Sequence, residues 1–310
     1  MQPNKALMHD GRCAPRHTAK AFGRRSRALA EVHADVQTFD PSMIRTWTRR
    51  HLLLSTFGTL ATACAPSRVA AVPASAPRSI AEIEARVGGR VGVFALDTGT
   101  GRQLAYQPDE RFAMCSTFKW VLAAAVLARV DRAELALPER VTYSQADLLE
   151  HAPATREHVA EGFMTVDALA RAAVTVSDNT AANLLLAKIG GPAGFTQFVR
   201  SLGDPVTRLD RDEETLNTND LLGDPRDTTS PRAMVGLMRR VLCGDVLSPP
   251  SHERLLGWLR ACETGHNRLR AGLPQGWIVG DKTGSGGHCT VNDVAIAWPP
   301  GRAPSSSRPT

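Results

Sequence analysis

The segment that most restricts the fold of this chain runs from Ser116 to Arg132, because it is rich in Ala, Leu and Val and contains neither Gly nor Pro. Such a composition predicts an α-helix. Its apolar residues are not confined to one stripe, so the helix would not lie on a surface with one face in water. We therefore expect a fold built around a buried helix that begins at Ser116.

Ser116 and Lys119 are three residues apart, which places both side chains on one face of this helix. A serine hydroxyl becomes a good nucleophile only when a neighbour takes its proton. A lysine can do this only when burial or a nearby positive charge, such as Lys282, lowers its pKa. Taken alone, the same spacing also fits an ordinary helix N-terminus with a serine cap.

Two further short motifs follow in order, Ser177-Asp178-Asn179 and Lys282-Thr283-Gly284. Alone, the first also fits a turn or cap before a helix from Ala181 to Ile189. The second precedes an apolar, strand-like run from Val291 to Trp298. The ordered set of three motifs points to one site far more strongly than any one motif does. A fourth element is Glu213, with Asn217 four residues later.

With this set of motifs the chain resembles the class A serine β-lactamases, for which the three short motifs are a known signature. The resemblance extends from about Ser79 to Ala303. It includes the stretches 109–112, 178–185 and 223–229.

The resemblance implies roles for the residues of the motifs. Ser116 would attack the lactam carbonyl, and Lys119 would help to remove its proton. Glu213 with Asn217 would position and deprotonate the water that hydrolyses the acyl-enzyme. Whether Lys119 or Glu213 is the base for acylation stays open.

The remaining motif residues would bind and protonate the substrate. The backbone N–H groups of Ser116 and Ser285 would form the oxyanion hole. Ser177 would pass a proton to the departing ring nitrogen, with Lys282 providing a positive field for that hydroxyl and for the substrate carboxylate. Asn179 would bind the acyl-amide carbonyl and help to orient Lys119.

Members of the family hold the substrate carboxylate with an arginine, which is supplied from one of two positions. Val291 occupies the first position here, so Arg268 would supply the guanidinium from the second, with Thr283 and Ser285 adding hydroxyl donors and Gly284 completing the motif. The alternative is that Arg268 is a surface arginine on a solvated loop.

The loop that carries Glu213 has the residues of a clamp. Arg211 and Asp227 match the ion pair that closes this loop in the family. Such a pair would fix the geometry of the loop more than it would stabilise the fold. Glu214 stands where many members have Pro, at a peptide bond that is often cis in the family.

The resemblance implies an α+β fold with an antiparallel sheet, flanking helices and an all-α half. We expect a hairpin from 91–97 and 102–107, a helical half over about 113–249, and strands near 280–284 and 291–298, with the active site between the halves. Beyond Ala303 the family has one more strand and a long final helix. A chain ending at Thr310 would lack both, so we expect reduced stability.

The N-terminal region predicts export. Residues 1–42 are interpreted as an upstream extension before a start at Met43. Residues 43–64 fit a signal peptide with the pair Arg49-Arg50, and 65–78 fit a linker before a domain over 79–310. This predicts a periplasmic location, by a twin-arginine route. Two fates stay open, lipidation at Cys64 or cleavage within the linker.

The composition, 43% hydrophobic and 22% charged, predicts a globular protein. Much of the net charge of +6 comes from residues before Arg50, so we expect no nucleic-acid partner. The six cysteines have no metal-ligand spacing, which predicts no metal, and no cofactor is implied. Disulfides among Cys243, Cys262 and Cys289 stay open, as does Cys115 as a small buried hydrophobic residue.

We expect a monomer that takes β-lactam antibiotics as substrates and has no transmembrane span. Three alternatives remain. The chain could be a penicillin-binding D,D-peptidase or transpeptidase, against which the loop from Glu213 to Asn217 argues. It could be a β-lactam sensor that stays acylated, or a truncated and inactive β-lactamase.

Overall fold

The computed structural model describes residues 78–218 and 223–301. The described helices are α2 (Arg78–Val87), α3 (Phe118–Asp131), α4 (Pro153–Glu157), α5 (Val166–Thr175), α6 (Asn179–Ile189), α7 (Gly191–Ser201), α8 (Pro231–Cys243), α9 (Pro249–Arg260) and α10 (Leu269–Gly272). The described strands are β1 (Val93–Leu96), β2 (Gln103–Tyr106), β3 (Phe112–Ala113), β4 (Arg140–Thr142), β5 (Phe163–Thr165), β6 (Thr228–Thr229), β7 (Ile278–Gly286) and β8 (Thr290–Trp298).

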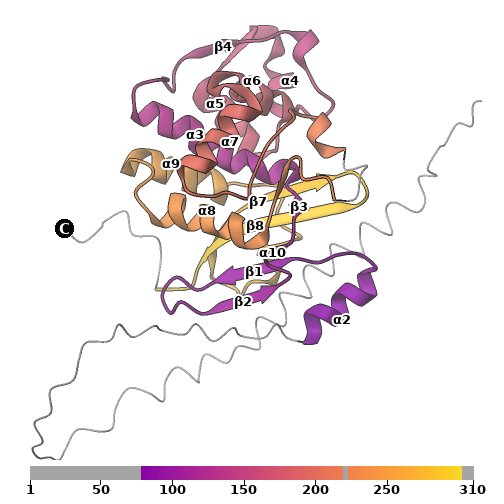
Figure 1. The fold of residues 1–310 in the computed structure, drawn as a ribbon. Helices are drawn as coiled ribbons and strands as arrows, with labels where there is room; N and C mark the ends of the chain where they lie inside the picture. The colour runs from indigo at the N-terminus through magenta and orange to yellow at the C-terminus, as the bar shows by residue number, and fades with distance from the viewer. Residues whose placement is uncertain (1–77, 219–222, 302–310) are drawn as a thin grey trace, which may run out of the picture.

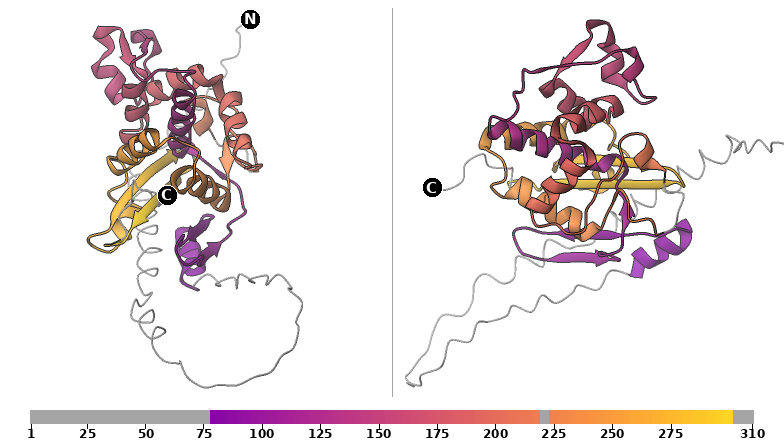
Figure 2. Two further views of the ribbon diagram at one scale, coloured as in Figure 1. Left: turned by 90° about the vertical axis from the view of Figure 1, so that its left-hand side faces the viewer. Right: turned by 45° about the horizontal axis from the view of Figure 1, so that its top comes forward.

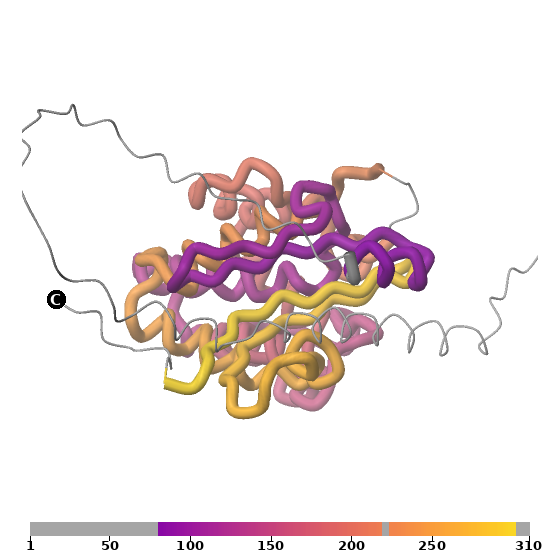
Figure 3. The backbone as a smooth tube through the Cα atoms, turned by 90° about the horizontal axis from the view of Figure 1, so that it is seen from below, coloured from indigo at the N-terminus to yellow at the C-terminus, as the bar shows by residue number. Residues whose placement is uncertain are grey.

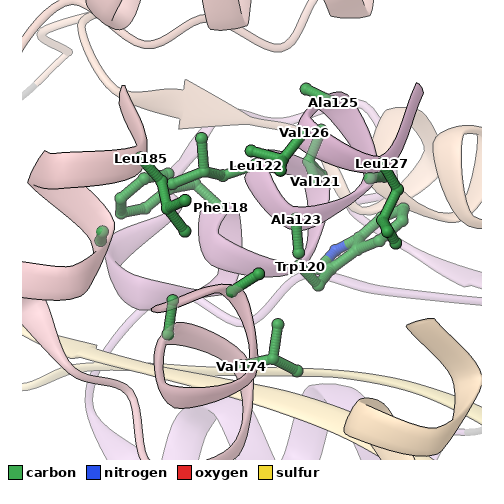
Figure 4. Packing of buried hydrophobic residues seen from close by; sticks show 14 of the residues in the cluster. Phe118, Trp120, Val121, Leu122, Ala123, Ala125, Val126, Leu127, Val174 and Leu185 are labelled. Atoms are coloured by element: carbon green, nitrogen blue, oxygen red, sulfur yellow. The ribbon is translucent and has the colours of Figure 1, made fainter. Parts of the chain in front are cut away.

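Helix α3 is the centre of the molecule, as its composition predicts. Every residue from Phe118 to Ala128 is buried, and the helix contacts α5, α6, α7 and α9. Phe118 packs edge to face on Phe195, with 5.9 Å between the ring centroids. Figure 4 shows the side chains of α3 pointing in several directions into this core. The helix begins one 3₁₀ turn after its predicted start, because Cys115–Thr117 form that turn.

Helix α6, which carries Asn179, starts at a residue whose side chain accepts a backbone N–H group. The Asp178 carboxylate caps α6 by accepting the N–H of Ala181 at 2.8 Å. Because α6 starts at Asn179, it is two residues longer at its N-terminus than the predicted helix. It ends at Gly190, which has a left-handed φ of 90° that a glycine adopts without steric cost.

The strands form antiparallel pairs, and the chain has the predicted α+β architecture. Hairpin β1–β2 and the longer hairpin β7–β8 are separate two-stranded sheets. Figure 3 shows the two hairpins next to each other under the helices, in indigo and yellow. No backbone ladder joins them in the part of the chain that the structure describes.

The expectation that residues 113–249 are only helix and loop is wrong in detail. Strand β4 pairs with β5, and β3 pairs with β6. The first pair forms because Val141 and Met164 are cross-strand partners that are both buried, which favours a short ladder over a loop.

Two ends of the molecule are distinguishable. Helices α3 to α7 gather at one end, and α2 with β1–β2 lies at the other (Figures 1 and 2). Ile80 and Ile83 of α2 form a small hydrophobic cluster against β1 and β2, separate from the main core. The β7–β8 hairpin lies between the helical end and this smaller unit, and β7 contacts the 3₁₀ turn that carries Ser116.

The predicted N-terminal extension and signal peptide, Cys64 and residues 65–77 of the predicted linker lie outside the described residues, whereas Arg78 begins α2. Within 78–218 and 223–301, no helix combines the length and apolar character needed to cross a bilayer.

Candidate active site

Ser116 lies in a turn held tightly against strand β7. Cys115 has a left-handed φ of 46°, a conformation that is uncommon for residues other than glycine and often found at functional sites. A Cβ on Gly284 would lie 2.7 Å from the Met114 carbonyl oxygen and 3.2 Å from Cys115 Cβ. Only glycine therefore allows β7 this close to the turn that carries Ser116.

Lys119 is fully buried in a cage of oxygen atoms one turn along from Ser116. Its ammonium donates to Asn179 Oδ1 at 2.6 Å and to the Ser177 carbonyl at 2.8 Å. It also lies 2.9 Å from Glu213 Oε1. Burial lowers the pKa of Lys119, and the nearby Glu213 carboxylate opposes this shift by favouring the charged form.

Glu213 connects the nucleophile to the loop that follows α7. The Ser116 hydroxyl donates to Glu213 Oε1 at 3.3 Å, and Asn217 Nδ2 donates to Oε2 at 2.6 Å. The Ser116 hydroxyl thus donates to Glu213 Oε1, and the Lys119 ammonium lies against the same oxygen. One carboxylate therefore contacts the nucleophile, the buried ammonium and the predicted water-positioning amide.

The backbone of Glu213 is held by a residue that the motifs did not single out. Asn183 Oδ1 accepts the N–H of Glu213 at 2.9 Å, and Asn183 Nδ2 donates to the Glu213 carbonyl at 2.7 Å. Asn183 follows Asn179 by four residues, so both lie on the same face of α6. That spacing within the quoted stretch was the signal that could have identified Asn183.

The predicted clamp of this loop is confirmed. Arg211 Nε donates to Asp227 Oδ2 at 2.6 Å, and Asp227 Oδ1 accepts the N–H groups of Asp210 and Arg211. The peptide bond between Glu213 and Glu214 is cis, as expected from the family.

Ser177 faces both buried lysines from the loop before α6. It has a left-handed φ of 61°. Lys282 Nζ donates to its hydroxyl at 3.1 Å, and Lys119 Nζ lies 3.4 Å from the same oxygen. Burial, and then the positive charge of Lys119, lower the pKa of Lys282 to about 7. A hydroxyl between two ammonium groups is placed to pass a proton onward.

Asn179 has a fixed amide orientation. Its Oδ1 accepts from Lys119, so its Nδ2 points away from the lysine and donates to Glu214 Oε1 at 3.2 Å. Glu214 is a site residue that the motifs did not predict to act.

Arg268 is buried against β7, not on a solvated loop. Its Nη1 donates to the Gly284 carbonyl at 2.8 Å and to the Asn292 carbonyl, and its Nη2 donates to Ser285 Oγ at 2.8 Å. The Thr283 hydroxyl lies 2.5 Å from the Thr264 hydroxyl. Guanidinium and hydroxyl donors thus gather beside Gly284, which suits a carboxylate.

Two carboxyl groups, of the buried Asp281 and the half-buried Asp293, contact the two residues that follow Arg268. Asp281 accepts from Arg270 Nε at 2.9 Å, and Asp293 Oδ2 accepts the N–H of Leu269 at 3.0 Å. Burial, and then the neighbouring Asp281 carboxylate, raise the pKa of Asp293 to about 8. Nothing in the motifs indicated this pair, because each residue appears in the sequence only as a polar position within a strand.

The remaining predicted residues have simpler surroundings. Burial raises the pKa of the Cys115 thiol to about 12, which agrees with its expected role as a small buried residue. Cys262 is a buried free thiol and Cys243 an exposed one, so neither contributes to the disulfides that the sequence left open. His151 is exposed, and its Nε2–H donates to the Val176 carbonyl at 3.0 Å. Among the described residues, no three His, Cys, Asp or Glu side chains form a group that could hold a metal ion.

Comparisons with known proteins agree with this constellation. The model of a family described as the beta-lactamase enzyme family matches residues 76–305. The beta-lactamase AST-1 of Nocardia asteroides is 47% identical over 278 residues, covering 86% of this chain and 89% of that protein. A beta-lactamase of Streptomyces albus G is 48% identical over 234 residues, with 74% of each chain covered.

Among solved structures, the chain is similar to the class A beta-lactamase of the last common ancestor of Gram-negative bacteria. The identity is 59% and the TM-score is 0.71, over 73% of this chain and 86% of the other.

Proposed function

Because the chain belongs to the class A β-lactamases, we propose that Ser116, Lys119, Ser177 and Glu213 carry out its reaction in the arrangement described above. The enzyme hydrolyses the amide bond of the β-lactam ring through a serine acyl-enzyme, the reaction by which the family confers antibiotic resistance. We propose penicillins and cephalosporins as its substrates.

In acylation, the Ser116 oxygen forms a bond to the lactam carbonyl carbon, and its proton passes to Glu213. The 3.3 Å hydrogen bond from Ser116 to Glu213 supports Glu213 as the acceptor. Lys119, 2.9 Å from the same oxygen, holds the carboxylate in place. The backbone N–H groups of Ser116 and Ser285 stabilise the carbonyl oxygen as it gains negative charge.

The ring then opens as the carbon–nitrogen bond breaks. The nitrogen takes a proton from the Ser177 hydroxyl, which lies within reach of both lysines. Those contacts allow the lysines to return a proton to the Ser177 hydroxyl. The proton that Glu213 took from Ser116 then replaces the one that the lysines gave up. Asn179 Nδ2 binds the acyl-amide carbonyl. Lys282 and Arg268, together with Thr283 and Ser285, bind the substrate carboxylate.

In deacylation, Glu213 takes a proton from a water molecule as the water oxygen attacks the acyl carbon. The Ser116 oxygen leaves and receives that proton. Asn217 shares the Glu213 carboxylate and positions the water. The observation that carries this proposal is that Glu213 contacts both Ser116 and Asn217, because hydrolysis of a β-lactam acyl-enzyme needs a base and a water-positioning group beside the serine.

The test is turnover of a chromogenic cephalosporin, with the intact mass of the protein recorded in the same reaction. We expect steady hydrolysis that Ser116→Ala abolishes. A stable acyl adduct without turnover would favour the sensor or the D,D-peptidase. An unmodified and inactive protein would contradict the proposal.

Export to the periplasm is a further part of this proposal, with residues 43–64 as the signal and Arg49-Arg50 as its paired arginines. Cell fractionation of the wild type and of a variant with both arginines replaced by lysine tests it. Retention of the wild type in the cytoplasm would contradict it, and Cys64→Ser separates lipidation from cleavage in the linker. We also propose that the enzyme is a monomer. Sedimentation measurements of its mass in solution test this.

A further inference from the structure

Glu214 joins three segments of the chain at the edge of the site. It is half-buried, and its Oε1 accepts from Asn179 Nδ2 at 3.2 Å and from the backbone N–H of Glu150 at 3.1 Å. The carboxylate therefore links the loop of Glu213 to the start of α6 and to the loop before α4. The acylation and deacylation steps proposed above do not use it.

The partner of Glu214 is the amide proposed to bind the substrate. Asn179 Oδ1 is occupied by Lys119 at 2.6 Å, so the NH₂ end of this amide faces Glu214. A primary amide has two N–H bonds, so one can donate to Glu214 while the other donates to the acyl-amide carbonyl of a β-lactam. An acyl side chain attached to that carbonyl then lies beside the Glu214 carboxylate.

Charges of both signs lie on the segments that meet at Glu214. Glu150 is exposed on the neighbouring loop, and Glu213 lies on the same loop as Glu214, paired with the buried Lys119. His151, also exposed, is directed to the Val176 carbonyl. The guanidinium of Arg156 donates to the carbonyls of Leu149 and Glu150 at 2.7 and 3.2 Å.

We propose that Glu214 is a specificity-determining residue that disfavours β-lactams with a carboxylate on the acyl side chain and favours those with an ammonium group there. The inference rests on the proposed function, since it needs Asn179 to bind the acyl-amide carbonyl. Two unit charges several ångströms apart in a partly hydrated cleft would change kcat/KM about threefold relative to a neutral substrate. The cationic and anionic substrates would then differ about tenfold.

Three penicillins that differ at a single carbon test this inference. Benzylpenicillin, ampicillin and carbenicillin carry hydrogen, an amine and a carboxylate on the same carbon of the side chain. Measurements at about pH 6 keep the amine protonated. For each substrate, the kcat/KM of the wild type is divided by that of Glu214→Gln. We expect this quotient to be highest for ampicillin and lowest for carbenicillin.

Glu214→Gln removes the charge and keeps an oxygen that can accept from Asn179 and Glu150. We expect it to reduce the ampicillin-to-carbenicillin ratio about tenfold and to change benzylpenicillin little. Glu82→Gln removes an exposed carboxylate on α2, outside the site, and should leave the ratio unchanged. In the wild type, the ratio should also fall at high ionic strength, a measurement that needs no variant.

A ratio that Glu214→Gln leaves unchanged would overturn the inference. An equal loss for all three substrates would also overturn it, because that pattern shows that Glu214 only orients Asn179. Failure of the wild type to hydrolyse benzylpenicillin would instead refute the proposed function itself.

Discussion

Glu213 favours the charged form of the buried Lys119 within the site. Burial lowers the pKa of the lysine, and the carboxylate at 2.9 Å counteracts it, while Asn183 holds the backbone of Glu213 from both sides. A base fixed in this way needs no reorganisation during the reaction. In the proposed mechanism, Glu213 is therefore the residue that most directly separates turnover from simple acylation.

Replacing Glu213 with glutamine tests that separation. We expect kcat to fall about 10² to 10⁴-fold, because general base catalysis is lost while the shape of the side chain is kept. Intact-mass measurements should show an accumulated acyl-enzyme on Ser116. A variant that hydrolyses as fast as the wild type would exclude Glu213 as the base for deacylation.

Lys282 predicts a pH dependence of substrate capture. Its pKa, lowered to about 7 by burial and by Lys119, means that the free enzyme loses this positive charge as the pH rises above that value. Since kcat/KM reports the free enzyme, it should fall on the alkaline side with an apparent pKa near 7. A bound substrate carboxylate favours the charged lysine, so the corresponding fall in kcat should lie at higher pH.

A pH–rate profile of Lys282→Arg provides the control, because arginine stays charged throughout this range. We expect the alkaline fall in kcat/KM to disappear or to move upward in this variant. The same fall in both proteins would assign it to another group.

At the scale of elements, the site depends on the contact between β7 and the turn before α3. The 3₁₀ turn that carries Ser116 leads directly into the buried helix α3, and the glycine of the third motif lets β7 approach this turn. A contact between two backbones of this kind cannot relax by rotation of a side chain.

Gly284→Ala should therefore disturb both stability and activity. Its Cβ would lie 2.7 Å from the Met114 carbonyl oxygen, so β7 and the turn must separate. We expect the free energy of unfolding to fall by about 1–3 kcal/mol, with loss of most hydrolysis. Urea denaturation and the turnover assay measure the two effects.

Gly257 in α9 provides the matched control, because it is exposed in a helix and nothing lies within 4 Å of its added Cβ. We expect Gly257→Ala to stabilise the fold by about 0.5–1 kcal/mol without changing activity. Equal effects of the two substitutions would contradict the argument from close approach.

At the scale of the whole molecule, the β7–β8 hairpin packs on the helical core through α9, and it contains two neighbouring acidic residues, the buried Asp281 and the half-buried Asp293. The pKa of Asp293, raised to about 8 by burial and by Asp281, makes global stability depend on pH. The folded state binds this proton more tightly than the unfolded state. The stability it contributes is complete at low pH and is lost as the pH rises toward about 8.

Asp293→Asn removes this titration and keeps an oxygen that can accept the Leu269 N–H. We expect the free energy of unfolding of the wild type to fall, relative to the variant, between about pH 4 and pH 8, and the difference to stay constant above pH 8. Urea unfolding at several pH values measures it. If the wild type instead became more stable relative to the variant as the pH rose, the raised pKa of Asp293 would be contradicted.

The sequence by itself determined much of the local structure and predicted which groups react. Helix α3 and strand β8 could be predicted because composition and apolar runs act over neighbouring residues, and the ordered motifs carried the chemistry of Ser116 and Lys282. Only the tertiary structure decided how these groups meet. The hydrogen bond from Ser116 to Glu213 joins residues 97 positions apart. The roles of Asn183 and Glu214, and the burial of Asp293, likewise depend on contacts between distant segments, because burial and hydrogen bonding are properties of neighbours in space.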